Sequence, residues 1–307
     1  MLAVRAAGIS KSFGSTAAIR DLSLEIESGT VCGLIGPDGA GKSTLLRLLV
    51  GLLALDSGRI EIADTEAAGL PIELKDRIGY MPQRFSLYGD LTVAENMRFF
   101  ADYYAVPRAR YEERKAELFR FSGLGPFQDR FAGNLSGGMQ KKLALTCNLL
   151  HSPEILFLDE PTTGVDPVSR REFWRLIEEV NGQGATILFT TPYMDEAARC
   201  GRVGFLFEGR LLVHDSPANL IRTMEGRIAE IIAARPHDAL RTLKGADGIK
   251  SVYSFGESIH AVFEEGRGDL EAVRRALSEQ GQEDPRLRMI PPSFEDVFLA
   301  LAERRPG

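Results

Sequence analysis

The sequence predicts an α/β fold built on a buried parallel sheet and followed by a smaller α+β region, and three observations support this. A glycine-rich stretch, GPDGAGKST, separates an apolar segment at Val31–Ile35 from a helical pattern that begins near Lys42. Residues 155–160 form a continuous apolar run ending in two carboxylates, which is typical of a central strand buried on both faces. The periodicity changes at about Gly226, where shorter strand and helix patterns begin.

Length and composition exclude several classes of protein. The 307 residues suffice for two compact units, and the 44% of hydrophobic residues can supply a core for each. The 37 basic and 43 acidic residues give a net charge of −6, which argues against a surface that tracks nucleic acid. Cys32, Cys147 and Cys200 have no paired spacing, so we expect reduced thiols and neither a disulfide frame nor a zinc site.

No segment of the sequence is predicted to cross a membrane. The longest apolar run, residues 45–55, contains Arg47 and is shorter than the ~20 residues that a spanning helix needs. The first residues, MLAVRAAGISKSFG, lack the apolar core of a signal peptide. Together with the scattered cysteines, these features lead us to expect a protein of the cytosol.

Three strands are predicted around the glycine-rich turn. Residues 2–9 and 19–26 alternate apolar and polar side chains, as half-buried strands do. Residues 57–64 follow the helix after the turn and give a third, short strand of the same small sheet. Between the first two strands, Phe13 is either a stacking platform for a flat base or an ordinary packing residue.

The glycine-rich turn is predicted to bind the phosphates of a nucleotide, because G-x-x-x-x-G-K-[ST] between a strand and a helix is a phosphate loop. Its glycines let the backbone turn tightly, so that successive N–H groups and the helix dipole face the phosphates. Lys42 supplies an ammonium for the β- and γ-phosphates, and the Ser43 hydroxyl supplies a ligand for magnesium. The predicted nucleotide contacts here are Gly36, Pro37, Asp38, Gly39, Ala40, Gly41, Lys42, Ser43 and Thr44.

The two carboxylates that end the strand at 155–160 are predicted to do different jobs, since neighbouring strand residues point to opposite faces. Asp159 would hold magnesium, directly or through water, and Glu160 would face the γ-phosphate and orient or deprotonate the attacking water. Gln83 follows another short strand, and its amide is either a link between the metal and a water or an ordinary loop glutamine. Asp166 lies in a tight loop that could cross to another subunit.

From Leu91 to about Leu150 the pattern is helical and rich in aromatic residues. These residues are interpreted either as the core of a helical subdomain or, in part, as a groove for a partner's helix together with Phe85, Leu87 and Tyr88. The aromatic residues concerned are Phe99, Phe100, Tyr103, Tyr104, Phe119 and Phe121.

A second anion site is predicted inside this region. Ser136 stands at an N-cap position, and Gly137 and Gly138 keep the approach to the helix start free of side chains. One chain with one triphosphate does not need two such sites. We therefore expect this site to close on ATP held by another subunit, so that the nucleotide is sandwiched at a dimer interface.

With these motifs identified, the chain resembles the nucleotide-binding subunit of an ABC transporter. GPDGAGKST matches the Walker A loop, Gln83 the Q-loop, LSGGM the signature, ILFLDE the Walker B strand and GVDP the D-loop. These ordered motifs cover roughly the first 220 residues. Within the family, YMPQRFSLYGDLTVAEN and the long C-terminal extension are most similar to the drug-export branch, and in particular to the first cassette of YbhF-like exporters.

The resemblance implies a P-loop NTPase cassette over residues 1–224, with a RecA-like core, an antiparallel β subdomain and a helical subdomain at about 91–150. It implies an ATPase of the transporter type that uses ATP and Mg²⁺ on the cytoplasmic face of a membrane, with a permease and a second cassette as partners and no nucleic acid. Carried over by motif, the catalytic residues would be Glu160, Gln83 and Lys42, the metal ligands Ser43, Gln83 and Asp159, and further nucleotide contacts Phe13, Ser136, Gly137 and Gly138.

One residue departs from the family's pattern. After the strand at 186–190 the family usually places a histidine that contacts the γ-phosphate, as in TTHYMDEA, whereas this chain reads TTPYMDEA with Pro192. Proline offers neither a side-chain donor nor a backbone N–H. Thr190 or Thr191 either donates a weaker contact or, as is usual for a threonine at a strand end, has a structural role. Losing one preorganised donor costs about 10²–10³ in rate. We therefore expect slow turnover, intact ATP binding and pairing with a different, histidine-containing cassette.

Beyond the cassette, residues 225–307 predict a small α+β domain. Strand patterns at 225–234, 249–255, 259–263 and near Met289 alternate with helical patterns at 238–243 and 269–280, which is the βαββαβ order of a ferredoxin-like sandwich. Residues 216–224 read as the closing helix of the cassette and residues 293–305 as a last amphipathic helix. No catalytic constellation is visible in this region, so we expect it to serve regulation or subunit contact.

Two other function classes stay open on the sequence alone. An ABC-type ATPase that acts on ribosomes or DNA would share the five motifs, but the single cassette, the acidic balance and the lack of a coiled-coil or zinc insert argue against it. A regulatory ATP-binding subunit with little hydrolysis is the other class, and Pro192 keeps it open.

Overall fold

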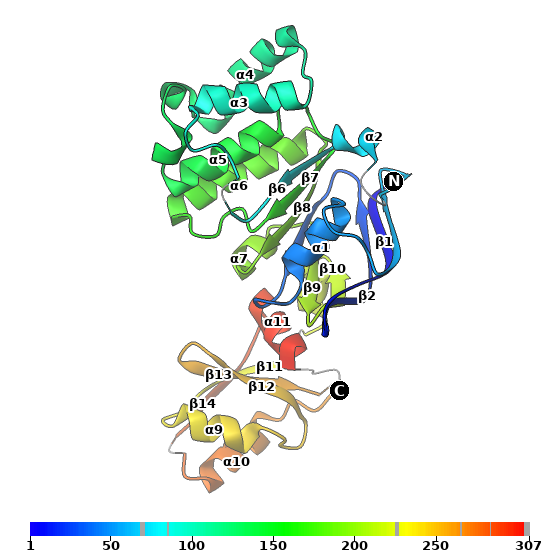
Figure 1. Cartoon of the computed structure of the whole chain (residues 1–307). Coiled ribbons are helices and arrows are strands. Elements are labelled where there is room, and N and C mark those ends of the chain that lie inside the picture. The colour runs from blue at the N-terminus through cyan, green and yellow to red at the C-terminus, as the bar shows by residue number, and fades with distance from the viewer. Residues whose placement is uncertain (68–70, 85, 225–226, 265, 283, 304–307) are drawn as a thin grey trace. The chain divides into compact units, whose positions relative to one another are not determined.

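The computed structural model describes residues 1–67, 71–84, 86–224, 227–264, 266–282 and 284–303 (Figure 1). The chain divides into two compact units, Met1–His214 and Asp215–Gly307. The sequence places the boundary ten residues later, between 224 and 225, because it assigns the helix that follows His214 to the cassette. That helix, α8 (Pro217–Arg222), contacts the last helix, α11 (Phe294–Glu303), and therefore belongs to the second unit.

The first unit contains a six-stranded sheet in the order β10-β9-β3-β8-β7-β6. Strand β3 pairs in parallel with β8 and β9, and β7 pairs in parallel with β6 and β8. Every residue of β7 and β8 is buried, which confirms the predicted central strand. The strands are β3 (Val31–Ile35), β6 (Ile78–Met81), β7 (Ile155–Asp159), β8 (Thr186–Thr191), β9 (Arg202–Phe207) and β10 (Arg210–Asp215).

A second, antiparallel sheet of this unit has the order β2-β1-β4-β5 and includes the three strands predicted around the glycine-rich turn. Its strands are β1 (Leu2–Phe13), β2 (Thr16–Glu27), β4 (Ser57–Ile62) and β5 (Thr65–Glu66). Helix α1 (Lys42–Leu49) contacts β2 of this sheet and β7 of the parallel sheet. One hydrophobic core therefore joins both sheets, with Ile26, Leu45 and Phe157 among its buried residues.

The helical region of the first unit surrounds α5 (Gly137–Asn148), which contacts α3 (Val93–Tyr103), α4 (Arg108–Ser122) and α6 (Pro167–Gly182). Helix α3 begins with a capping box, in which Thr92 and Glu95 each bond the other's backbone N–H. The remaining short segments are α2 (Ile72–Lys75), α7 (Met194–Ala197), η1 (Gly125–Phe127) and η2 (Ala132–Asn134).

The aromatic stripe supplies only the margin of this region's core, and Phe99 and Tyr103 lie outside it. None of its six residues is fully buried, and Phe99 and Tyr103 are 41% and 65% exposed. The phase set at the start of α3 turns Val93, Met97 and Ala101 inward, and residues on other sides of the helix face away from that core. Of the residues proposed for a groove, Tyr88 packs against Phe99, while Phe85 lies outside the described residues.

The second unit has the predicted βαββαβ order and adds a helix at each end. Its four strands are antiparallel to their neighbours and have the order β12-β13-β11-β14. The first predicted strand begins at 225, outside the described residues, and is observed from Ile228. The elements are β11 (Ile228–Ile232), α9 (Pro236–Leu243), β12 (Ile249–Phe255), β13 (Ser258–Phe263), α10 (Leu270–Glu279) and β14 (Arg286–Ile290).

Two further predictions can be compared with the structure. Cys32, Cys147 and Cys200 are free and buried, and burial raises the pKa of the Cys32 thiol to about 12. Across the part of the chain that the structure describes, no helix combines the length and the apolar character required to traverse a membrane.

Candidate functional site

The candidate site lies where the carboxyl ends of neighbouring parallel strands meet. Ile35 of β3 is in register with Thr191 of β8, and Asp159 of β7 is in register with Thr190. Ligands of parallel α/β sheets bind at this edge, outside the strand ends. A cavity of about 450 Å³ opens here, lined by residues 38–44, Gln83, Glu160, Glu208 and part of β2.

The loop that follows β3 requires glycine at two positions. A Cβ on Gly36 would lie 2.1 Å from the carbonyl oxygen of Leu206. Gly41 has a φ of +105°, and a Cβ there would lie 2.6 Å from the carbonyl oxygen of Ala18. Gly41 is also the N-cap of α1 and supplies no side chain, so the first N–H groups of the helix stay open to an anion. The predicted phosphate loop therefore forms a backbone-lined cradle.

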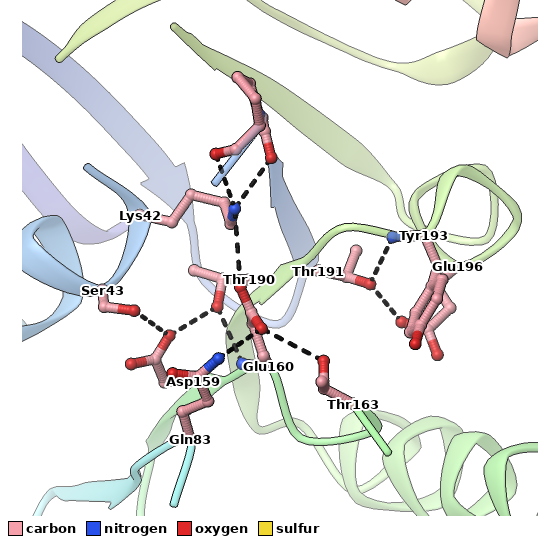
Figure 2. Close-up of polar contacts among 12 residues, drawn as sticks. Lys42, Ser43, Gln83, Asp159, Glu160, Thr163, Thr190, Thr191, Tyr193 and Glu196 are labelled. Carbon is pink, nitrogen blue, oxygen red and sulfur yellow. Dashed lines mark hydrogen bonds and ion pairs between the residues drawn. The ribbon is translucent and has the colours of Figure 1, made fainter. Parts of the chain in front are cut away.

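Lys42 is held at the mouth of this cradle. Its side chain is only 4% exposed, and its Nζ donates to the carbonyl oxygens of Gly36 and Pro37 at 2.8 and 3.1 Å (Figure 2). The same Nζ lies 3.6 Å from Glu160 Oε1. These contacts satisfy the buried ammonium and hold it beside the cradle, where its N–H groups can donate to an incoming phosphate.

Asp159 is fully buried, and its two carboxylate oxygens differ in their hydrogen-bond partners. Its Oδ1 accepts hydrogen bonds from Ser43 Oγ at 2.8 Å and from Thr190 Oγ1 at 2.9 Å. Its Oδ2 is buried without a hydrogen-bond partner among the described residues. Because burying an unpaired carboxylate oxygen is costly, this atom is a ready ligand for a cation.

Glu160 lies one residue beyond β7 and has a left-handed backbone, with φ of +45°. Its Oε2 accepts from Gln83 Nε2 at 2.7 Å and from Thr163 Oγ1 at 3.2 Å, while Oε1 faces Lys42. Side-chain donors thus hold this carboxylate at the edge of the cavity. The two carboxylate groups, Asp159 and Glu160, have different side-chain partners.

The donor set suits magnesium better than a transition metal. Within the described residues, no group of three or more His, Cys, Asp or Glu side chains could hold a metal ion. Magnesium prefers oxygen ligands and is usually held by one or two carboxylates together with water and phosphate oxygens. Ser43 Oγ and Asp159 Oδ2 are oxygen atoms of this kind, and Gln83, which lines the same cavity and donates its amide nitrogen to Glu160, stays a predicted third ligand.

Lys141 is a member of this site that the sequence reasoning missed. It extends from α5, and its Nζ donates to the backbone oxygen of Gln83 at 2.7 Å. Burial lowers the pKa of Lys141, although the charges of Asp159 and Glu160 act in the opposite direction. Its position one turn into the helix after Ser136 was the available signal, because the start of that helix was already assigned to an anion.

Pro192 follows β8, and neither neighbouring threonine replaces the missing histidine. Thr190 bonds Asp159 and the backbone N–H of Glu160, whereas Thr191 donates to Glu196 Oε2 at 2.5 Å and accepts from the N–H of Tyr193. Both threonines are fully buried and bonded within the protein, which favours the structural interpretation over a weak phosphate contact. The cavity lining includes none of the four histidines, which are His151, His214, His237 and His260.

The residues predicted from the signature do not line the cavity. Ser136 caps α5 by accepting from the N–H of Met139 at 3.3 Å, and both Ser136 and Gly137 are exposed. Gly138 lies against α6, since a Cβ there would be 2.6 Å from Ser169 Oγ. Asp166 caps α6 by accepting from the N–H groups of Val168 and Ser169.

Phe13 is placed beside the cavity and outside its lining. The side chain is 50% exposed, and Lys11 Nζ lies 5.7 Å from the centre of its ring. Its partner in the β1–β2 hairpin, Thr16, does line the cavity. The base-stacking and packing interpretations of Phe13 both remain predictions.

Comparisons with known proteins agree with this geometry. A family model described as ABC transporter matches residues 19–163. The chain is similar to the probable multidrug ABC transporter ATP-binding protein YbhF of Escherichia coli (strain K12), with 40% identity over 292 residues. That match covers 92% of this chain and 49% of YbhF, so the chain spans about half the length of that relative.

A second relative and a solved structure extend the comparison. The Nod factor export ATP-binding protein I of Rhizobium sp. (strain N33) is 35% identical over 305 residues, covering 99% of this chain and 98% of the relative. Among solved structures, a dimeric ATP-binding cassette in a post-hydrolysis state bound to ADP and Pi is 25% identical, with a TM-score of 0.63. The match covers 69% of this chain and 98% of the chain in that structure.

Proposed function

The chain belongs to the family of ABC transporter ATP-binding proteins, and from this premise we propose that it is the ATP-hydrolysing subunit of an export transporter. The observation that carries the proposal is the meeting of Lys42, Glu160 and the unpartnered Oδ2 of Asp159 beside a backbone cradle. The names of the relatives, which are a probable multidrug transporter protein and a Nod factor export protein, support export as the direction.

The residues of the cavity would divide the work of hydrolysis among them. The N–H groups of residues 38–44 and the ammonium of Lys42 bind and neutralise the phosphates. Ser43 and Asp159 hold the magnesium ion, which balances the charge on the phosphate oxygens when it is bound. Glu160 accepts a proton from, or orients, the attacking water, and Gln83 and Thr163 keep its carboxylate in place.

The second anion site would act on a neighbouring subunit. Ser136 and Gly137 are exposed at the start of α5, where they offer N–H groups to a nucleotide held by another cassette. The dimeric cassette bound to ADP and Pi supports this arrangement for a structurally similar protein. Asp166, in the loop before α6, would contribute to the same interface.

Pro192 would make the chain's own site slow. Because no histidine lines the cavity and both neighbouring threonines are bonded elsewhere, one donor to the γ-phosphate is missing. We therefore favour a heterodimer in which the partner cassette supplies the faster site and this chain supplies the partner's signature residues. A regulatory ATP-binding subunit with little hydrolysis is the second candidate, and the same residue favours it.

The remaining surfaces would connect the subunit to a permease at the cytoplasmic face of the membrane. The exposed aromatic residues Tyr88, Phe99 and Tyr103 supply an apolar surface suited to a permease helix. For the second unit, residues 225–307, we propose a ferredoxin-like accessory domain in regulation or subunit contact. The strand order and its antiparallel pairing support that classification.

The proposal is tested by the ATPase activity of the purified chain. We expect slow, Mg²⁺-dependent hydrolysis, which Lys42→Ala abolishes and Pro192→His raises by about 10²-fold. Rapid, cooperative hydrolysis without a partner that Pro192→His does not increase would contradict the slow-site assignment. Co-purification with an integral membrane protein would separate a transporter subunit from a soluble ATPase of the same family.

A further inference from the structure

Thr190 is the one described residue whose side chain bonds both Asp159 and Glu160, and the proposed mechanism gives it no role. It lies on β8, in register with Asp159 on β7, and is fully buried (Figure 2). Its Oγ1 donates to Asp159 Oδ1 at 2.9 Å and accepts from the backbone N–H of Glu160 at 2.9 Å. A hydroxyl has one proton to donate and can accept at the same time, so both bonds can exist together.

The bond to Asp159 determines which of its oxygens is left for a metal. Ser43 Oγ and Thr190 Oγ1 both donate to Oδ1, whereas Oδ2 has no partner among the described residues. When Ser43 turns to a metal ion, the bond from Thr190 still fixes the plane of the carboxylate. Partners of this kind, which hold a ligand without touching the metal, orient the ligand and tune its affinity.

The bond to Glu160 supports an unfavourable backbone conformation. Glu160 has φ of +45°, and left-handed conformations of residues other than glycine cost of order 1 kcal/mol or more unless the surroundings hold them. Its N–H lies just beyond β7 and bonds the threonine side chain, at a point where the strand has ended. This turn directs the carboxylate toward Lys42 and Gln83.

We propose that Thr190 is a positioning residue for hydrolysis. Through one hydroxyl group it holds Asp159 so that Oδ2 stays free for a metal, and it supports the backbone turn that orients the Glu160 carboxylate. This inference rests on the proposed ATPase function. It assigns to β8, which ends before Pro192, the task of aligning the metal ligand and the water-orienting carboxylate with each other.

The test uses the full-length chain and compares Thr190→Val, which keeps the shape and removes the hydroxyl, with Thr190→Ser, which keeps the hydroxyl. Single-turnover ATP hydrolysis is measured against Mg²⁺ concentration, and ATP binding is measured separately in EDTA. We expect Thr190→Val to lower the rate constant and raise the half-saturating Mg²⁺ concentration, each by about 10–100-fold, and Thr190→Ser to restore most of both. ATP binding in EDTA should stay within about threefold of wild type, since the loop and Lys42 are untouched.

Thr186→Val is the matched control, because Thr186 is a buried threonine of the same strand whose hydroxyl accepts from the N–H of Gly29. It should leave the Mg²⁺ dependence unchanged. Equal kinetics for Thr190→Val and wild type, or a serine variant as impaired as the valine variant, would overturn the inference while leaving the ATPase function intact. A wild-type chain that binds no ATP and hydrolyses none would overturn both. If Thr190→Val fails to fold, Thr190→Ala removes the same hydroxyl and is judged by the same criteria.

Discussion

Two buried aspartates, one in each unit, show how differently a carboxylate can be held. Asp296 in the second unit is 1% exposed and fully bonded: Oδ1 lies 2.5 Å from His260 Nδ1 and accepts from the Tyr253 hydroxyl, and Oδ2 accepts twice from Ser293. Asp159 in the first unit is 0% exposed, and its Oδ2 has no partner among the described residues.

The contrast separates a structural carboxylate from one available for ligand binding. Asp296 fastens the first turn of α11 to β13, because His260 is a residue of that strand. Asp159 leaves one oxygen without a protein partner among the described residues, beside a phosphate cradle, where a bound cation would satisfy it. Asp296 is therefore a structural carboxylate, whereas Asp159, whose free oxygen lies beside a phosphate cradle, is the candidate ligand.

The largest expected effect concerns the first unit. Glu160→Gln removes the group that orients or deprotonates water, so hydrolysis should fall by about 10²–10⁴-fold while ATP binding persists. Rates and ATP affinity measured on the same preparation check this. Glu178→Gln is the control, because Glu178 pairs with Arg199 at the surface of the same unit. A Glu160 variant that hydrolyses ATP at the wild-type rate would contradict the catalytic role of Glu160.

The next effect concerns the stability of the second unit. Asp296→Ala removes the carboxylate that accepts from His260 and Ser293, and breaking a buried pair in this way costs about 3–5 kcal/mol. Hydrogen exchange of residues 228–303 should accelerate accordingly. Trp174, the single tryptophan, lies in the first unit, so its fluorescence transition in urea should stay in place as an internal control. Unchanged exchange would show that the bonds of Asp296 add nothing to stability.

Removing the charge of Asp159 in the first unit should not lower the free energy of unfolding. Asp159→Asn in metal-free buffer removes a buried charge with an unsatisfied oxygen and should leave stability unchanged or raise it by up to about 1 kcal/mol. Urea unfolding followed by Trp174 fluorescence measures this change. If Asp159→Asn were destabilised as strongly as Asp296→Ala, the distinction between the two carboxylates would fail.

The smallest expected effect is on pH dependence. Burial tends to raise the pKa of Asp296, but hydrogen bonds from His260 and Ser293 outweigh it and hold that pKa below its ordinary value. A lowered folded-state pKa contributes stability above the unfolded-state value, and this contribution is lost as the pH falls through the folded-state pKa. Below about pH 4, the protection of second-unit amides, taken relative to their intrinsic exchange rates at each pH, should therefore fall with falling pH. In Asp296→Asn, amide protection should depend less on pH in this range. An unchanged pH dependence would contradict the lowered pKa of Asp296.

The sequence predicts the cassette well because its motifs stand at the ends of strands. Parallel strands bring their carboxyl ends to one edge, so Lys42, Ser43, Gln83, Asp159 and Glu160 meet although they are far apart in the chain. The order of elements in the second unit follows equally from local periodicity.

What the sequence predicts poorly depends on packing between elements. The side of α3 that packs against α5 decides that Phe99 and Tyr103 lie outside the core, and the count of aromatic residues does not reveal it. The contact between α8 and α11 joins segments about 75 residues apart in sequence and moves the boundary between the units. The bonds of Thr190 likewise depend on the register of two strands, which a strand-end threonine does not disclose.

The most direct test of the account is ATP affinity with and without Mg²⁺, measured calorimetrically for the wild-type chain and for Asp159→Asn. We expect Mg²⁺ to tighten ATP binding by at least about tenfold in the wild type and to have little effect in the variant, since the free oxygen of Asp159 is the proposed metal ligand. The claim that the free oxygen of Asp159 binds the metal would be contradicted if Mg²⁺ did not change the ATP affinity of the wild type. It would also be contradicted if the variant kept the full Mg²⁺-dependent increase in affinity.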